Sequence, residues 1–217
     1  MDARRLVTPS ANGQDERVTE TETVPAGVPA EGTRARVERA ALDLFTLRGF
    51  ENVTTDEVAD AAGISRGTFF RYYATKADAV WGDFTGHVSR LEERLAVSDP
   101  AQPVLASVCA AYVAVNDYAD AELPLLRERM HLILTEPALL AHSQLRFAEI
   151  DRAVARHGAA RTGASPTALV PRLVAATTRA AATTAFEVWL ADERSSLGRH
   201  LHLAFDEISA GFPGLRG

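Results

Sequence analysis

The segment 54–76 holds the side chains whose types and spacing could contact a nucleic acid. Arg66, Thr68 and Arg71 can project from one short helix. An arginine can bind guanine O6 and N7 together, and a threonine methyl can contact a thymine methyl. Gly67 is a poor helix former, worth roughly 1 kcal/mol against alanine, so its presence indicates close approach of the backbone to something large. These residues predict base reading in a DNA groove.

A second group in the same segment suits the phosphate backbone of DNA. Thr54, Thr55 and Ser65 fall at predicted helix N-termini, where outward-pointing backbone N–H groups favour phosphate. Tyr72 and Lys76 are placed for backbone contacts, which fix the register of a protein on DNA without reading its sequence.

Two short helices joined by a tight turn must position these groups. Thr54 and Glu57 have the spacing of a capping box, which marks the first helix start. Gly63 permits a positive φ in the turn, Ala59 lets the helices cross closely, and Phe69 fills the angle between them. This pattern predicts a helix-turn-helix. A solvated helical hairpin is the alternative, but it does not require turn glycine, caps and exposed arginines together.

The stretch from Thr54 to Tyr73, with Lys76, resembles the TetR family of bacterial transcriptional regulators. The resemblance implies an Ω-shaped homodimer of nine-helix subunits, with three N-terminal helices that bind DNA and the rest forming a ligand-binding and dimerisation domain. It also implies that Phe69 and Tyr73 pack inside the head. The residues that it assigns to DNA contact are Ser65, Arg66, Gly67, Thr68, Phe70, Arg71, Tyr72 and Lys76. Position 70 is commonly Tyr in the family, so one hydroxyl contact to phosphate is absent here.

Segments further along the chain resemble the TetR branch typified by the mycofactocin-system regulator. They are Trp81–Phe84, Arg127–Met130, Ile133–Leu139, Ala141–Ser143 and Glu187–Leu190. Because members of that branch are associated with acyl-coenzyme A, the resemblance implies a ligand of this class.

The composition agrees with an all-α, soluble and cytoplasmic protein. The chain has 217 residues, 47% of them hydrophobic, with one cysteine and a net charge of -6. Ala, Leu, Arg and Glu favour helices, and no alternating strand pattern is found. One cysteine excludes an internal disulfide framework. No apolar run approaches the roughly 20 residues of a membrane span, and the N-terminus lacks the apolar core of a secretory signal.

Apolar spacing and breakers predict nine helices, three in a head and six behind it. They lie at about 33–48, 54–62, 66–72, 76–97, 104–118, 125–135, 137–157, 166–190 and 197–210. The domains expected are a disordered tail at 1–32, a DNA-binding domain at 33–76 and a ligand-binding and dimerisation domain at 77–217. The tail carries three basic and six acidic residues, and phosphate would repel an acidic arm. Residues 33–76 carry seven basic and six acidic residues, so the excess of positive charge is local to the head.

The fifth to eighth helices are expected to enclose a mainly apolar pocket with a few polar handles. The eighth is rich in Ala and Thr between 175 and 185, which leaves room for a guest or lets helices approach at a dimer interface. Each polar candidate could instead be an ordinary core or surface group, and Arg127 and Arg146 could form surface ion pairs. The candidate ligand residues are Trp81, Phe84, Arg127, Met130, His131, His142, Arg146 and Glu187.

Other functions are less consistent with the sequence. None of the six histidines forms the i, i+4 pair or Cys/His cluster of a helical zinc site, and no nucleophile elbow, phosphate loop or dinucleotide fingerprint is found. We therefore expect no metal, no cofactor and no enzymatic activity. The expectation is a homodimeric regulator, most simply a repressor, released from a palindromic operator by an apolar ligand such as an acyl-CoA. The alternatives are a multidrug-type sensor for an efflux gene and a ligand-independent structural DNA-binding protein.

Overall fold

The computed structural model describes residues 32–215, and the regular structure in that range is entirely helical. The all-α prediction is therefore confirmed. The predicted tail at 1–32 lies outside the described residues except for Gly32, which precedes the first helix. Ten α-helices and two short 3-10 turns follow in order: α1 Thr33–Arg48, α2 Thr55–Ala61, α3 Arg66–Tyr72, α4 Lys76–Trp81, α5 Phe84–Ala96, α6 Val104–Val115, η1 Asp120–Glu122, α7 Leu123–Thr135, α8 Pro137–Thr162, α9 Leu169–Ala191, α10 Leu197–Ala210 and η2 Pro213–Leu215.

Helices α1–α3 form the head. Its helix cap, turn glycine and buried aromatic rings form as the sequence predicts. The Thr54 hydroxyl accepts from Glu57 N while the Glu57 carboxylate accepts from Thr54 N, which completes the capping box. Gly63 has φ +68° in the turn, a backbone conformation that costs glycine little. Phe69 is fully buried and Tyr73 nearly so, so both pack inside the head as expected.

The predicted fourth helix, 76–97, is wrong as a single helix, because the chain breaks at Gly82 and Asp83. Gly82 ends α4 with φ +61°, and the Asp83 carboxylate accepts from Gly86 N to cap α5. The break makes ten helices rather than nine. It gives α4 only six residues, between the head and the long helices behind it.

Two further helix boundaries differ from the prediction. Gly158 lies inside α8, not in a loop, and it is buried because Val104 and the Pro171 backbone approach it closely. The start signal at Ser165–Pro166 forms a turn instead, in which Ser165 Oγ accepts from Thr167 N. Helix α9 begins only at Leu169.

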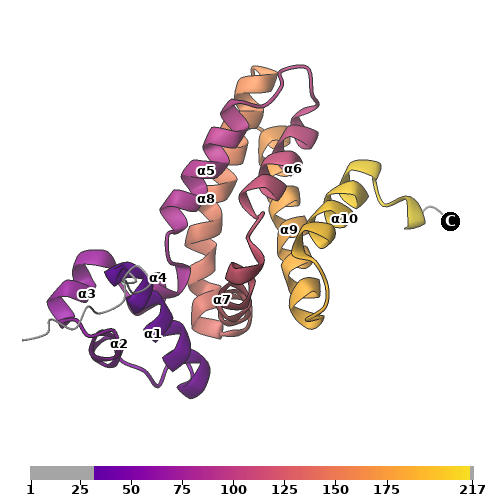
Figure 1. Cartoon of the computed structure of the whole chain (residues 1–217). Helices are drawn as coiled ribbons and strands as arrows, with labels where there is room; N and C mark the ends of the chain where they lie inside the picture. The colour runs from indigo at the N-terminus through magenta and orange to yellow at the C-terminus, as the bar shows by residue number, and fades with distance from the viewer. Residues whose placement is uncertain (1–31, 216–217) are drawn as a thin grey trace, which may run out of the picture. The chain divides into compact units, whose positions relative to one another are not determined.

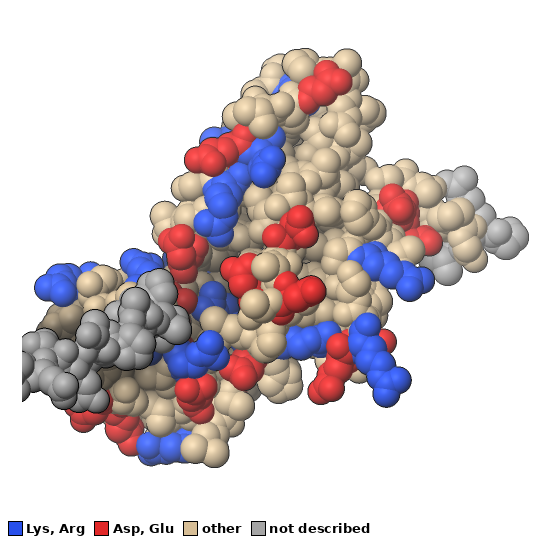
Figure 2. All heavy atoms as spheres, viewed as in Figure 1, with Lys and Arg blue, Asp and Glu red and all other residues tan. Residues whose placement is uncertain are grey.

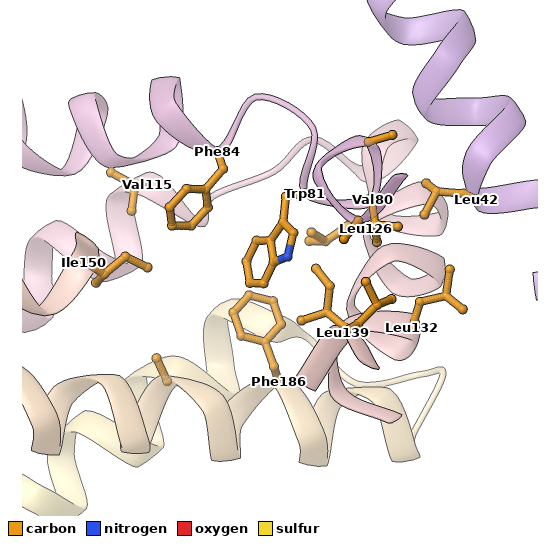
Figure 3. Packing of buried hydrophobic residues seen from close by; sticks show 14 of the residues in the cluster. Leu42, Val80, Trp81, Phe84, Val115, Leu126, Leu132, Leu139, Ile150 and Phe186 are labelled. Atoms are coloured by element: carbon orange, nitrogen blue, oxygen red, sulfur yellow. The ribbon is translucent and has the colours of Figure 1, made fainter. Parts of the chain in front are cut away.

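Helices α4–α10, called here the sensor region, pack around α8 and α9. Helices α5 and α8 run side by side, and α10 crosses α9 (Figure 1). The buried apolar residues of the head and the sensor region belong to one continuous cluster. Figure 3 shows a part of this cluster, with the Trp81 ring between Phe84 and Phe186. The core therefore continues across the predicted domain boundary at residue 76.

Candidate functional site

The exposed face of α3 presents the residues predicted to read bases. Arg66, Gly67, Phe70 and Arg71 are exposed, and Thr68 is half-buried. The Arg66 guanidinium forms an ion pair with Asp56 of α2, Nη1 to Oδ1 2.6 Å, and lies over the Phe70 ring. This pair holds Arg66 at the surface in one orientation. In Figure 2, basic and acidic side chains lie interspersed over the head at lower left.

The hydroxyl residues of the head act as helix caps. Ser65 Oγ accepts from Thr68 N at 3.1 Å and lies 3.0 Å from Thr68 Oγ1. Thr54 caps α2, where Thr55 is the first residue. In the Glu57 carboxylate, hydrogen bonds from Thr54 and Arg48 lower the pKa to about 2. The Asp56–Arg66 ion pair joins the first turn of α2 to the start of α3.

Lys76 is engaged within the protein. Its Nζ donates to the carbonyl oxygens of Phe50 (2.7 Å) and Val53 (2.9 Å) and lies 4.2 Å from the Phe50 ring centroid. Two of the three ammonium donors are therefore used to anchor the chain after α1. A phosphate contact by Lys76 stays a prediction, with one donor left for it. Tyr72 is half-buried, with Arg71 against its ring.

A cavity of about 220 Å³ lies inside the sensor region. Aromatic and aliphatic side chains form most of its wall, and Trp81 projects between Phe84 and Phe186 (Figure 3). Helices α4 to α9 contribute to it, and α1 contributes one residue, Glu38. The lining residues are Glu38, Trp81, Asp83, Phe84, His87, Arg90, Tyr112, Asn116, Tyr118, Leu126, Arg129, Met130, Ile133, Leu134, Phe147, Ile150, Arg179, Ala182, Thr183 and Phe186.

Burial keeps the histidine and the two tyrosines of the cavity wall uncharged. Burial, together with the neighbouring positive charge of Arg90, lowers the pKa of His87 to about 4. Burial raises the pKa of Tyr112 and of Tyr118 above the ordinary value. At neutral pH the imidazole and both phenols are therefore neutral, and the wall suits an apolar guest.

One ion pair closes the cavity on the side of the head. Arg129 Nη2 of α7 lies 2.7 Å from Glu38 Oε2 of α1, and both side chains are largely buried. Glu38 Oε1 also accepts from the Tyr73 hydroxyl at 2.9 Å. Tyr73 directly follows α3 and caps it. A chain of contacts thus connects the cavity wall with the end of the exposed helix.

A second set of contacts joins α4 to α8. Arg146 Nη2 donates to Asp78 Oδ1 at 2.6 Å, and His142 Nε2 lies 3.3 Å from the same oxygen. Burial alone would raise the pKa of Asp78, but hydrogen bonds from Arg146 and Thr75 outweigh it and lower the pKa. These contacts therefore hold the short helix α4 against α8.

Comparison with known proteins agrees with a two-part regulator. The family model described as "Bacterial regulatory proteins, tetR family" matches residues 39–79. The model described as "MftR C-terminal domain" matches residues 102–213. The chain is 38% identical over 179 residues to the putative mycofactocin biosynthesis transcriptional regulator MftR of Mycobacterium tuberculosis, covering 82% of this chain and 90% of that protein. The chain belongs to the TetR family. It is a TetR-family transcriptional regulator, with a C-terminal region of the mycofactocin-regulator type, as its motifs predict.

Solved structures of TetR-family repressors share the fold. Thermus thermophilus FadR in complex with lauroyl-CoA matches with a TM-score of 0.54 and 22% identity, covering 82% of this chain and 94% of that one. The SmeT–triclosan complex matches with a TM-score of 0.58 and 19% identity, covering 83% and 91%; SmeT represses the multidrug efflux pump SmeDEF of Stenotrophomonas maltophilia. None of the described helices is long and apolar enough to cross a membrane.

Of the eight predicted ligand residues in this TetR-family regulator, three line the cavity. They are Trp81, Phe84 and Met130. Arg127 does not line it, because its guanidinium donates to the carbonyl oxygens of Trp189, Asp192 and Glu193 and so holds the end of α9. Arg127 therefore has a structural role at the end of α9 instead of the predicted role in ligand binding.

The other four predicted ligand residues also lie outside the cavity lining. His131 and Glu187 are exposed. His142 and Arg146 are half-buried, but Asp78 engages both. Arg146 additionally contacts Glu149 at 3.5 Å, which fits the ion-pair alternative for this residue.

The sequence reasoning missed Arg129, although a signal for it was present. Leu126 and Ile133 are buried on α7, and Arg129 lies three residues after the first and four before the second. That spacing places all three on one helix face. Glu38 carries no comparable signal, because only the packing of α1 against α7 brings it to the cavity.

Proposed function

We propose that this protein is a ligand-responsive repressor that binds a palindromic operator as a homodimer and leaves it when the cavity is occupied. The observation that carries the proposal is the Glu38–Arg129 ion pair, which makes one residue of the head part of the cavity wall. A guest in the cavity would therefore touch the head directly.

An exposed apolar face supports the homodimer. On α9 it includes Leu173 and Val188, and on α10 it includes Leu203, each about half exposed. Phe186, Leu201 and Phe205, on the same two helices, are buried within the subunit and do not belong to this face. Two-fold symmetry of the protein would match a palindromic operator.

A mainly apolar ligand fits the cavity wall, and an acyl-CoA is the first class to test. The FadR complex with lauroyl-CoA supports this choice, since that repressor shares the fold. A volume of about 220 Å³ equals about seven liquid waters at roughly 30 Å³ each. This space fits part of an acyl chain, and the coenzyme would lie outside the cavity.

We propose that the ligand releases the operator because it binds the DNA-free conformation more tightly than the DNA-binding one. A ligand shifts an equilibrium between two conformations only if it prefers one of them. The six-residue α4 connects the head with α5 and carries both Trp81 and Asp78. A guest that displaces Trp81 would rotate α4 about the Gly82 break, and Asp78 would move with it. We propose that the two heads of the dimer then lose the spacing that the operator requires.

The test is a titration of lauroyl-CoA into the protein–operator complex, followed by fluorescence anisotropy of labelled DNA. Free coenzyme A and laurate are the controls. We expect release by lauroyl-CoA at concentrations at which free coenzyme A has no effect. Retention of the DNA at saturating lauroyl-CoA would contradict the acyl-CoA proposal.

A multidrug-type sensor is the second candidate. The SmeT–triclosan complex supports it, because that repressor has the same fold and holds a compact aromatic compound. Triclosan is therefore titrated in parallel. Release of the operator DNA by triclosan but not by lauroyl-CoA would favour a multidrug sensor over an acyl-CoA sensor.

A further inference from the structure

Two N–H donors in the cavity wall have no acceptor. They are Trp81 Nε1 and Arg129 Nε, both buried and both without a hydrogen-bond partner. Trp81 is only 8% exposed, and its nitrogen lies on the side of Leu126 in Figure 3. The Arg129 guanidinium lies beside Gly82, which directly follows Trp81, and both Trp81 and Arg129 line the cavity. A buried donor left without a partner destabilises the protein, so an acceptor for these two donors would be favourable.

The carboxylates of the same wall, in contrast, already have partners. Glu38 accepts from Tyr73 through Oε1 and from Arg129 through Oε2. Asp83 accepts from Gly86 N through Oδ1, and its Oδ2 lies 3.8 Å from Arg90 Nη1. Both carboxylates therefore already serve structural contacts, whereas Trp81 Nε1 and Arg129 Nε serve none.

We infer that the cavity binds the compact, uncharged part of a ligand, with a carbonyl oxygen that accepts from Trp81 Nε1 and Arg129 Nε. Its hydrocarbon part lies against Phe84, Met130 and Phe186. A carbonyl oxygen has two lone pairs and no donor, which matches two N–H groups. This inference rests on the proposed function and specifies the ligand class of the same cavity.

Charge selects the neutral carbonyl over a carboxylate or an amine. The three arginines of the wall already pair with carboxylates, Arg129 with Glu38, Arg90 with Asp83 and Arg179 with Asp151. A ligand carboxylate would therefore place a further negative charge beside Glu38, and like charges at a shared site repel. An amine would bring donors and a positive charge, and it would not supply the acceptor that Trp81 Nε1 and Arg129 Nε lack. The neutral His87 adds no positive charge that would hold an anion.

The experiment compares three eight-carbon probes by calorimetry on the DNA-free protein. The probes are methyl hexyl ketone, octanoate and octylamine. We expect the ketone to bind tightest, with about tenfold or greater preference over each charged probe. Equal affinities for the three probes, or preference for octylamine, would overturn the inference.

Two matched tryptophan variants test the hydrogen bond itself. Trp81→Phe keeps an aromatic ring and removes the indole N–H, so we expect about tenfold weaker ketone binding. Trp189→Phe is the control, because Trp189 is fully buried but does not line the cavity. Arg129→Lys keeps the charge that faces Glu38 and removes Nε, so it should also weaken binding of the ketone. Unchanged affinity in both Trp81→Phe and Arg129→Lys, with folding confirmed by thermal unfolding, would contradict the inference.

Operator release, measured separately, distinguishes this inference from the proposed function. Ketone binding that depends on Trp81 but leaves the operator complex intact supports the carbonyl site and contradicts ligand control of DNA binding. Release by lauroyl-CoA that is equally strong in the parent, Trp81→Phe and Arg129→Lys proteins supports the repressor and contradicts the carbonyl site.

Discussion

Arg129 of α7 and Glu38 of α1 meet directly beside Gly82, where α4 ends. A Cβ atom at Gly82 would lie 2.7 Å from Arg129 Nη1 and 2.7 Å from Glu38 Oε2. The ion pair therefore occupies space that only a glycine leaves open. The glycine at the break between α4 and α5 therefore makes room for the ion pair that joins the head to the cavity wall.

Gly82→Ala should lower the stability of the protein and displace the ion pair. The φ of +61° is unfavourable for any residue with a Cβ, at about 1–3 kcal/mol, and the new methyl group would push Arg129 and Glu38 apart. Urea unfolding measures the loss. Gly198→Ala is the control, because its Cβ would meet nothing closer than 3.9 Å. An unchanged midpoint for Gly82→Ala would show that the pair adapts without cost.

Arg66→Ala should weaken operator binding by about 1–3 kcal/mol per subunit if Arg66 reads a base. Asp56→Asn should act in the opposite direction, because it frees Arg66 from its ion pair and removes a negative charge near phosphate. Anisotropy titrations with an operator selected from random duplexes, and with a scrambled duplex, measure both. Arg152→Ala, an exposed position on α8, is the control. Equal losses on operator and scrambled DNA would assign Arg66 to the backbone instead.

Lys76→Met should destabilise the head, because two carbonyl oxygens lose a charged donor. Hydrogen bonds of this kind contribute about 1.5–3 kcal/mol each. Thermal unfolding measures this effect. The salt dependence of DNA binding, measured well below the unfolding midpoint, tests the phosphate contact separately: a contact predicts a slope lower by about 1 per lysine, and an unchanged slope would leave Lys76 with a structural role alone.

Val188→Glu should dissociate the dimer, because it places a charge on the exposed apolar face of α9 that we propose as the interface. Val188 is 47% exposed in the single subunit, so the substitution should leave the fold intact. Sedimentation at micromolar concentration distinguishes monomer from dimer. Leu47→Glu is the control, since Leu47 is 81% exposed on α1. A dimer that survives Val188→Glu would place the interface elsewhere.

The head was predictable because its signals are local. The Thr54–Glu57 box, Gly63 and the Ser65 cap each act within a few residues, and all three form as expected. The break at Gly82–Asp83 also carries a local signal, a glycine followed by a capping aspartate, but the apolar spacing on both sides concealed it.

The cavity residues were less predictable because they depend on which helix faces meet. Arg127 and Arg129 are two positions apart on α7 and lie on nearly opposite faces, so only one can reach the cavity. The sequence favoured neither. Arg127 binds the backbone at the end of α9, and the contact of α7 with α1 places Arg129 beside Glu38. Tertiary packing therefore determines which arginine reaches the cavity, and the same packing places Glu38 in the cavity wall.

The stability of the protein should fall as the pH is lowered from about 7 to 5, in part through His87. Burial lowers the pKa of His87 in the folded protein from 6.5 to about 4. Between these two values the unfolded chain binds more protons than the folded protein, so the free energy of unfolding decreases as the pH falls. Above 6.5 the contribution of His87 is complete and does not change.

His87→Gln should therefore flatten this pH dependence, as measured by urea unfolding at steps between about pH 7 and 5. A residual slope is expected, because burial also lowers the pKa of His157. Glu57, with a pKa of about 2, loses its contribution only in more acidic solution, so it does not interfere. His202→Gln is the control, since His202 is exposed on α10. Equal slopes for the parent and His87→Gln would show that His87 takes up its proton without cost, and that the cavity wall is open to water.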